Sequence, residues 1–130
     1  MASIFTKIIN GDIPSYKVGE NEYCYAFLDI QPIVKGHVLV VPKNEVDYIF
    51  DLDDQSYAEL SKFAKSIAQK MDKVFDCNRI GVSVVGLEVP HAHIHLFPIN
   101  SVSDMDFSRP KLNLSANEME EIAARIRNAI

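Results

Sequence analysis

Hydrophobic residues recur at helical spacing in three segments of the chain. The first segment, Ser3–Asn10, predicts a short helix that ends before Gly11. The second, about Asp53–Phe75, predicts a long helix with one apolar face. The third follows Ser115, which has the spacing of a capping box with Glu118. The long apolar face comprises Leu60, Phe63, Ala64, Ile67, Met71 and Val74, and the C-terminal one comprises Met119, Ile122, Ile126 and Ile130.

Five other segments have the composition of β-strands. They are Tyr16–Gly19, Tyr23–Ile30, His37–Val41, Arg79–Val85 and His91–Ile99. The connections among the first three are too short for parallel crossovers, so we expect an antiparallel meander. The second strand is rich in Tyr, Phe and Cys, which is typical of a half-buried strand. Strands and helices without βαβ alternation predict an α+β fold.

The length of 130 residues is that of one domain, and we expect a single domain over 1–130. A domain of this size buries enough surface to fold without a disulfide or a metal ion. The 13 Lys and Arg against 18 Asp and Glu give a net charge of −5, which argues against a partner that is nucleic acid. A small anionic ligand is not excluded, since a few local donors hold a phosphate whatever the net charge.

The cysteines and the N-terminus indicate the compartment. Cys24 and Cys77 lie far apart and form no C-x-x-C pair, so we expect free thiols in a reducing compartment, with Cys24 in the core. No apolar run approaches the roughly 18 residues of a membrane span, and the first residues lack the basic and apolar regions of a signal peptide. We therefore expect a cytoplasmic protein with no membrane partner.

The segment Pro90–Phe97 reads PHAHIHLF and holds three of the four histidines. In a strand, this alternation puts His91, His93 and His95 on one face and the apolar residues on the other. We expect the apolar face to pack on the core and the imidazole row to face a groove or solvent. A structural role explains this row poorly, because nothing in sheet stability favours three imidazoles in register.

A metal site is one alternative, because histidine is the commonest metal ligand. The first and third Cα atoms of the row lie about 13 Å apart at ~3.3 Å per residue, whereas each metal–nitrogen bond is only about 2.0–2.1 Å. Three rings on one ion would therefore strain the strand. His37 with two of the three could bind zinc, but no nearby cysteine pair supports that site, and we expect no required metal or cofactor.

Nucleophilic catalysis is the other alternative. A neutral imidazole, with a pKa of about 6.5, has a free lone pair at pH 7. It can attack phosphorus and form a phospho-imidazole intermediate that water resolves. Flanking histidines can donate hydrogen bonds to the phosphoryl oxygens as charge develops there. His93 has a histidine on each side and is the expected nucleophile.

The histidine segment resembles the His-φ-His-φ-His-φ-φ signature of the histidine triad (HIT) family, where φ is an apolar residue. The similarity extends over residues 3 to about 99 and includes IFxKIIxGxIP from Ile4, AFxDIxP from Ala26 and GHxLVVPK from Gly36. The chain looks like the Hint branch, whose members are nucleoside phosphoramidases and nucleotide-binding proteins. The resemblance implies a HIT-like fold, in which a five-stranded antiparallel sheet accompanies one long helix, a short N-terminal helix and a C-terminal helix in an extension over 100–130.

The resemblance also implies catalytic roles. His93 would be the nucleotidylated residue, with His91 and His95 beside it. His37 would support the row from the neighbouring strand. The family further implies a homodimer, with the sheets joined across a two-fold axis and the long helix in part of the interface.

A purine nucleotide, with an AMP or GMP moiety, is the implied ligand. Asp29 would accept hydrogen bonds from the ribose hydroxyls. Backbone N–H groups of Glu88 and Val89 would be donors near the phosphate. The purine would lie in an apolar slot lined by Ile4, Phe5, Ile8, Ile13, Phe27 and Ile30.

Three features depart from the family pattern. The Gly-rich loop before the triad is shortened to Gly86–Pro90 and lacks the usual Gln. Glu88 replaces a small hydroxyl residue, and Glu45 replaces a histidine often seen after Pro-Lys. A carboxylate close to the scissile bond leads to the hypothesis that Glu88 recognises an amine leaving group such as a lysyl ammonium.

Together these implications favour an enzyme that cleaves purine nucleoside 5′-phosphoramidates or related adenylates at the α-phosphate. A dinucleoside polyphosphate hydrolase of the same family is one alternative, although that branch typically keeps the loop Gln. A nucleotide- or zinc-binding module with little turnover is another. The sequence leaves open the role of the segment from Ser101 onward.

Overall fold

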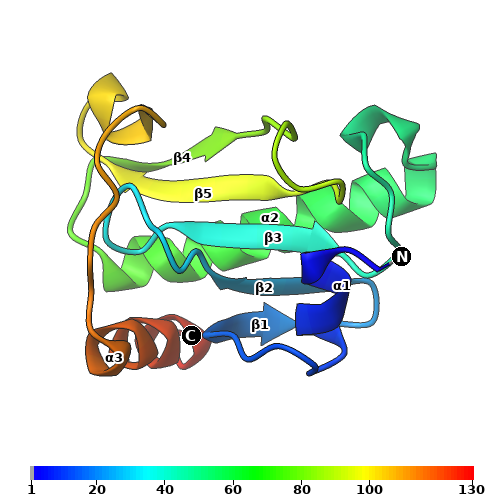
Figure 1. The fold of residues 1–130 in the computed structure, drawn as a ribbon. Coiled ribbons are helices and arrows are strands. Elements are labelled where there is room, and N and C mark those ends of the chain that lie inside the picture. The colour runs from blue at the N-terminus through cyan, green and yellow to red at the C-terminus, as the bar shows by residue number, and fades with distance from the viewer. Residues whose placement is uncertain (1) are drawn as a thin grey trace.

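A computed structural model describes residues 2–130, so Met1 of the predicted domain lies outside the described residues. Residues 2–130 form three α-helices and five strands (Figure 1). In chain order they are α1 (Ile4–Ile9), β1 (Lys17–Glu20), β2 (Cys24–Leu28), β3 (Val38–Pro42), α2 (Asp54–Val74), β4 (Arg79–Ser83), β5 (Ile94–Ile99) and α3 (Ala116–Arg127), with 3₁₀ turns at Ile49–Asp51 and Val102–Met105.

The five strands form one antiparallel sheet in the order β1-β2-β3-β5-β4. The predicted α+β fold and the meander β1–β2–β3 are confirmed. Insertion of β5 between β3 and β4 has a consequence for the histidines. It pairs His95 with Leu39, and so brings the histidine segment beside the strand that follows His37.

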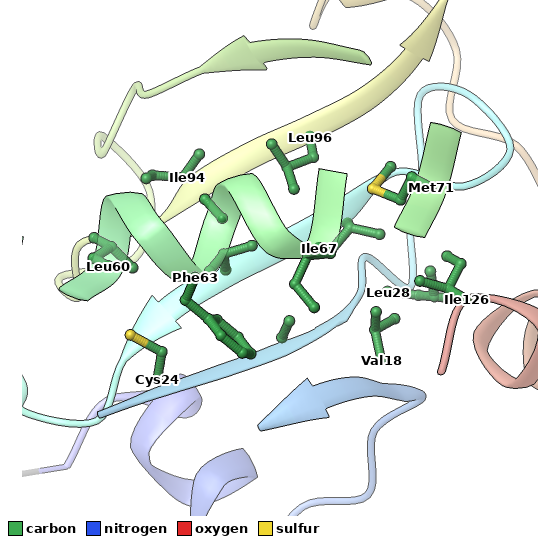
Figure 2. Close-up of a cluster of buried hydrophobic side chains, with 14 of the residues drawn as sticks. Val18, Cys24, Leu28, Leu60, Phe63, Ile67, Met71, Ile94, Leu96 and Ile126 are labelled. Carbon is green, nitrogen blue, oxygen red and sulfur yellow. The ribbon is translucent and has the colours of Figure 1, made fainter. Parts of the chain in front are cut away.

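Both faces of the sheet are covered. On one face, α2 and α3 bury the main apolar core, as the sticks of Figure 2 show for Leu60, Phe63, Ile67 and Met71 against Leu96 and its neighbours. The other face carries α1 and a smaller apolar cluster, and Figure 1 shows α1 and α2 on opposite sides of the strands. The smaller cluster consists of Phe5, Ile8, Tyr25, Phe27, Leu39 and Val41.

Side-chain caps set where the helices begin. Ser3 accepts the N–H of Thr6 at the start of α1, and Asp53 accepts the N–H of Ser56 at the start of α2. The predicted capping box at Ser115 is present at the start of α3. All three predicted helices are therefore confirmed.

Several strand predictions need correction. β2 is shorter than predicted and is buried along its whole length, because α2 covers one face and α1 the other. β5 begins at Ile94 rather than His91, since the ladder with β3 starts there. Ile130 was placed in the stripe of the last helix but is 99% exposed, beyond the end of α3. Cys24 is a buried free thiol, as predicted.

Within the described residues 2–130, the structure has no helix that combines the length and the apolar character of a membrane span.

Candidate functional site

The three histidines before and within β5 lie on one side of the sheet. His91 and His93 precede the strand, and His95 is its second residue. The ring centroids of His93 and His95 are 4.8 Å apart, and Phe5 of α1 stands edge-on to His91 at 5.7 Å and to His93 at 5.0 Å. The intervening residues Ala92 and Ile94 belong to the core under α2. The predicted alternation of faces is confirmed.

The row is more buried than the alternation predicted. His91 is 0% exposed, and His93 and His95 are each 6% exposed. α1 covers one end of the row, and the C-terminal segment covers the other through Phe107, whose ring centroid is 5.0 Å from that of His95. His93 and His95 still line a cavity of about 190 Å³ with the loop Val85–Glu88. The expected groove exists for these two rings, whereas His91 is enclosed.

Hydrogen bonds fix each imidazole. His91 Nε2 lies 2.8 Å from the carbonyl oxygen of Pro42, and His93 Nδ1 lies 2.8 Å from the carbonyl oxygen of His91. His37 Nε2 and His95 Nδ1 are 2.9 Å apart. Within residues 2–130, every buried side-chain nitrogen and oxygen has a hydrogen-bond partner. These bonds offset the cost of removing four polar rings from water.

The four rings are neutral at pH 7. Burial, together with smaller contributions from neighbouring imidazoles and Lys111, lowers the pKa of His37 and of His95 to about 3. Burial also lowers the pKa of His91 and of His93, although the bonds to backbone carbonyls act in the opposite direction. Each ring therefore has one N–H and one lone pair, as a nucleophile or a hydrogen-bond relay requires.

His37 supports the row from the β3 side. Gly36 turns the chain into this position with a φ of +88°, a region that favours glycine, and a Cβ there would collide with the ring of Phe75. His37 is buried and stacks near Phe97, with ring centroids 4.3 Å apart, besides its contact with His95. The structure therefore brings the fourth predicted histidine to the site.

The residues predicted for the purine slot line one cavity of about 120 Å³. Phe5, Ile8 and Phe27 are buried and form its walls, while Ile30, which is 71% exposed, lies at the rim. Asp29 also lines this cavity, at the side that leads to His37. The complete lining is Ile4, Phe5, Ile8, Ile13, Pro14, Ser15, Phe27, Leu28, Asp29, Ile30 and Leu39.

Asp29 lies in a half-buried position between the slot and the histidines. Its carboxylate accepts the N–H of Gln31 at 2.9 Å and lies 3.8 Å from His37 Nδ1. Burial raises the pKa of Asp29, while the bond from Gln31 and the charge of Lys111 act to lower it. A carboxylate here has free acceptor capacity for a ligand hydroxyl.

Glu88 and Val89 occupy different places, although both were predicted at the phosphate. Glu88 is exposed and lines the cavity of His93 and His95. Val89 packs against the smaller apolar cluster, and its carbonyl oxygen accepts the N–H of His91 at 2.8 Å. The structure therefore places the side chain of Glu88, but not that of Val89, on the open cavity.

Asp29, His37 and His95 also form a potential metal-binding group. Each offers one ligand atom, and these atoms lie within 4.8 Å of one another. Two of the three are buried, so a bound ion would be poorly accessible to water. This set corresponds to part of the zinc alternative, in which His37 joins members of the triad.

The C-terminal segment contributes to the site, which the sequence did not indicate. Phe107 contacts both His95 and His37, and Lys111 Nζ lies 5.9 Å from the centroid of the Phe107 ring. The N–H of Leu112 donates to the carbonyl oxygen of Pro32 at 2.8 Å, which ties this segment to the turn before His37. A single Phe in a polar segment carries no periodicity that would have revealed this role.

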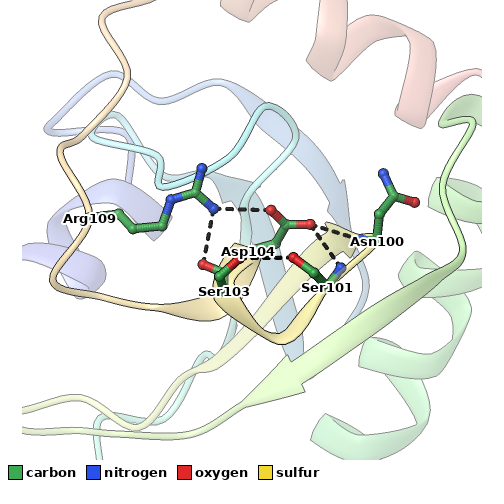
Figure 3. A network of polar contacts seen from close by, with 5 residues as sticks. All are labelled: Asn100, Ser101, Ser103, Asp104 and Arg109. Atoms are coloured by element: carbon green, nitrogen blue, oxygen red, sulfur yellow. Dashed lines mark hydrogen bonds and ion pairs between the residues drawn. The ribbon is translucent and has the colours of Figure 1, made fainter.

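A polar network holds the start of this segment in place (Figure 3). Asp104 accepts the N–H groups of Asn100 and Ser101 at 2.8 and 3.2 Å, and it pairs with Arg109 at 3.0 Å. Arg109 also donates to the carbonyl oxygen of Ser103. The network closes the 3₁₀ turn and directs the chain back over the histidines.

Comparison with known proteins agrees with this geometry. The profile of the HIT domain matches residues 10–102. A HIT-like protein of Borreliella burgdorferi is 34% identical over 131 residues, which cover 95% of this chain and 94% of that protein. The adenosine 5′-monophosphoramidase hnt1 of Schizosaccharomyces pombe is 32% identical, with 98% of this chain and 100% of that protein covered. The crystal structure of a Hit-like protein from Bartonella henselae superposes with a TM-score of 0.85 at 30% identity, over 98% of this chain and 96% of that one.

Proposed function

The chain belongs to the HIT family, and we propose that this hydrolase cleaves purine nucleoside 5′-phosphoramidates or related adenylates at the α-phosphate through a nucleotidyl-histidine. Similarity to named adenosine 5′-monophosphoramidases supports hydrolysis of nucleotides in general. The choice of His93 as nucleophile depends on one observation, the bond between its Nδ1 and the carbonyl oxygen of His91.

That bond defines the tautomer of His93. A carbonyl oxygen only accepts hydrogen bonds, so His93 Nδ1 carries the ring proton and Nε2 keeps the lone pair. A neutral ring with a free lone pair needs no activation by a base. His93 Nε2 forms the bond to phosphorus, while the bond from phosphorus to the leaving nitrogen or oxygen breaks.

His37 and His95 form a relay that delivers hydrogen to the reaction. The N–H of Ile33 points to His37 Nδ1 at 3.4 Å, so that His37 Nε2 carries the proton and donates to His95 Nδ1. His95 Nε2–H then remains for the phosphoryl oxygen or the leaving group. The proton of His95 Nε2 passes to the departing amine, and the proton of His37 Nε2 moves to His95 Nδ1. His37 Nδ1, beside the Asp29 carboxylate, takes up a proton from solvent, so both rings stay neutral.

Water completes the cycle by attack on the nucleotidyl-histidine. Its proton passes to His95 Nε2, which has given up its own, while the proton on His95 Nδ1 returns to His37 Nε2 and His37 Nδ1 releases a proton to solvent. The bond between His93 Nε2 and phosphorus breaks, and the nucleoside monophosphate leaves. The nucleotide itself is held by the slot under α1, with Asp29 as acceptor for the ribose hydroxyls and the exposed Ile30 over the purine.

In this proposal, Glu88 determines which leaving groups the enzyme prefers. Its exposed carboxylate lines the cavity that His93 and His95 share, so a leaving amine that carries a second, cationic amine would be attracted to it. Glu88→Gln should lower kcat/KM for a lysine-linked adenylate by about 5-fold and leave an alkoxy-linked adenylate unaffected. Equal losses on both substrates would contradict this preference.

Trapping of the covalent intermediate tests the nucleophile. Wild-type protein is mixed with adenosine 5′-phosphoramidate, quenched in the first turnover and digested for mass spectrometry. We expect an adenylyl group on the peptide that contains His93, and no adduct and no AMP release from His93→Ala. Release of AMP by His93→Ala at the wild-type rate would contradict the mechanism. Assays of the wild-type protein with diadenosine polyphosphates test the alternative substrate.

A hydrogen-bonded pair accounts for His37 and His95 better than a shared zinc ion does. Their facing nitrogens are 2.9 Å apart, whereas two ligands at about 2.0–2.1 Å in a tetrahedral zinc site lie roughly 3.3 Å apart. A metal would also need the lone pair of both nitrogens and would remove the shared proton. Metal analysis of protein purified without chelators tests whether this pair binds zinc. Stoichiometric zinc in the wild type that is lost in Asp29→Asn would contradict the hydrogen-bonded pair.

A homodimer is part of the proposal. β4 is an edge strand with exposed Val82, and the exposed Val84 follows its end. Both valines line an apolar hollow of about 400 Å³ with Tyr57 and Ala64 of α2. An unpaired edge beside an apolar surface of this kind favours pairing with a second copy. We expect a dimer by sedimentation equilibrium and a monomer for Val84→Lys.

A further inference from the structure

A polar cluster surrounds the enclosed ring of His91, away from the reaction cavity. Glu45, in the loop after β3, accepts the backbone N–H of Ser3 and the hydroxyl of Thr6, both at 2.6 Å. The hydroxyl oxygen of Ser3 lies 2.7 Å from His91 Nδ1. Ser3 and His91 are both buried, although 88 positions separate them in the chain. The four residues therefore join three distant parts of the sequence.

The bonds around His91 leave one arrangement of protons. The carbonyl oxygen of Pro42 accepts from Nε2, so Nδ1 must accept, and the Ser3 hydroxyl donates to it. Ser3 Oγ in turn accepts the N–H of Thr6 at 3.1 Å. His91 is thus held as a neutral ring of one tautomer, with no N–H left for a phosphoryl oxygen. Its side chain is enclosed, which fits a role that does not involve contact with substrate.

The backbone of His91 connects its fixed ring to the nucleophile His93. Its carbonyl oxygen is the acceptor for His93 Nδ1, the bond that sets the tautomer of His93. The same cluster also fixes α1, since Ser3 is the N-cap of that helix. α1 has only six residues and is too short to be stable alone, so it depends on contacts of this kind. Phe5 of α1 touches both His91 and His93 and walls the purine slot.

A comparison with the start of α3 shows what is unusual at α1. At α3 the carboxylate of the capping box is local, because Glu118 lies three residues after Ser115. At α1 the position three residues after Ser3 is Thr6, and the carboxylate comes from Glu45, 42 residues away. The cap of α1 is therefore a tertiary link, and hydrogen bonding to Ser3 and Thr6 lowers the pKa of Glu45 to about 2, so it is ionised at all working pH values.

We propose that Ser3, Thr6 and Glu45 are positioning residues that hold His91 in one tautomer and couple the nucleotide-binding helix α1 to the nucleophile His93. The catalytic consequence rests on the proposed function, whereas the tautomer of His91 is a property of the protein without substrate. In this arrangement, the same hydrogen bonds fix the position of α1 at the purine slot and the tautomer of His93.

The test uses ¹⁵N chemical shifts of the imidazoles together with steady-state kinetics on adenosine 5′-phosphoramidate. We expect Ser3→Ala to move the His91 Nδ1 resonance by several ppm toward the value of an unbonded nitrogen, to lower kcat by about 10-fold, and to raise KM because the N-cap of α1 is lost. Glu45→Ala should also raise KM, because it releases α1. Glu45→Gln keeps an acceptor oxygen and should recover most of both losses.

Two further variants keep the outcome decisive. Thr6→Val removes a half-buried hydroxyl that donates to Glu45 and lies 3.4 Å from Ser3 Oγ and 3.5 Å from His91 Nδ1, so it carries the test if Ser3→Ala does not fold. Glu121→Ala removes an exposed carboxylate of α3 and is the matched control. Wild-type His91 shifts and wild-type kcat in Ser3→Ala and Thr6→Val would overturn the proposal. Wild-type protein that is inactive on the substrate while the His91 shifts respond would reject the proposed function but keep the network.

Discussion

Alternate residues of the short segment from His91 to Leu96 face two different environments. On one side, Ala92, Ile94 and Leu96 contact the core under α2 and need only close packing with carbon atoms. On the other side, the three imidazoles are equally inaccessible but depend on backbone carbonyls, a serine and a fourth histidine for hydrogen bonds. Burial on the two sides of one strand thus serves different ends.

Low exposure alone therefore does not identify a residue of the hydrophobic core. Buried apolar groups stabilise the fold by their removal from water, whereas buried imidazoles contribute only as far as their partners offset desolvation. The histidine side keeps its rings neutral and fixed in direction, and this order serves the site. A change on the apolar side should therefore affect unfolding first, and a change on the histidine side should affect turnover first.

His95→Ala is expected to give the largest effect. It removes the last donor of the relay from His37, and loss of a positioned acid–base group typically lowers kcat by about 10²–10⁴-fold. Single-turnover assays with adenosine 5′-phosphoramidate measure the rate. Loss of less than about 5-fold, in a variant that binds AMP normally, would show that His95 is structural.

Leu96→Ala should show the opposite behaviour from the adjacent position. Leu96 is 1% exposed in the main core, and deletion of a buried leucine side chain costs roughly 2–5 kcal/mol of the free energy of unfolding. Below the unfolding transition, the activity per folded molecule should stay within about 3-fold of wild type, because the side chain points away from the site. Urea unfolding with activity assays on the same samples measures both. A severe loss of activity in fully folded Leu96→Ala would contradict the expectation that the apolar side affects stability and not turnover.

Much of this arrangement follows from the sequence. The period of two in HAHIH placed the triad on one face, and the helical spacing of apolar residues, with the capping box at Ser115, located the three helices. These are local signals, because a side chain and its partner lie within a few residues. Strand ends were less predictable, since β5 begins only where β3 provides a ladder partner.

The remaining features depend on contacts between distant segments. Nothing near Phe107 shows that its ring reaches His95, and nothing near Glu45 shows that it caps α1. The motif resemblance brought together the slot residues, which periodicity alone would assign to the core. The predicted exposure of the triad was too high because α1 and the C-terminal segment cover its ends, and amphipathic patterning describes a strand without such covers.

The histidine side makes the free energy of unfolding depend on pH, whereas the apolar side does not. His37 and His95 have a folded-state pKa of about 3, against about 6.5 in the unfolded chain. Between these values the unfolded chain binds protons that the folded protein does not, so the stability present above pH 6.5 is lost as the pH falls. The limiting slope is roughly 1.4 kcal/mol per pH unit for each group that stays neutral.

Urea titrations between pH 7 and pH 5 isolate this effect, since carboxylates titrate mainly below that range. We expect the free energy of unfolding to fall with pH in wild type and in Leu96→Ala alike. In His95→Ala the slope should be shallower, because one of the four histidines whose pKa burial lowers is gone. An unchanged slope in His95→Ala would mean that the rings are not protected from protonation in the folded state.

Phe107→Ala should give the smallest effect and tests where the histidine side ends. Phe107 is 39% exposed, and its ring covers His95 and His37 at the edge of the reaction cavity. Its removal lets water reach the relay but leaves every hydrogen bond of the row in place, so we expect a decrease in kcat/KM of about 3-fold and a rise in the pKa of His95 toward its ordinary value. Tyr23→Ala, at an aromatic residue that is also 39% exposed and lines a cavity that the histidines do not share, is the control. NMR titration of His95 decides the point, since an unchanged pKa would show that the row is closed without the C-terminal segment and that burial of the histidines is a property of the sheet and α1 alone.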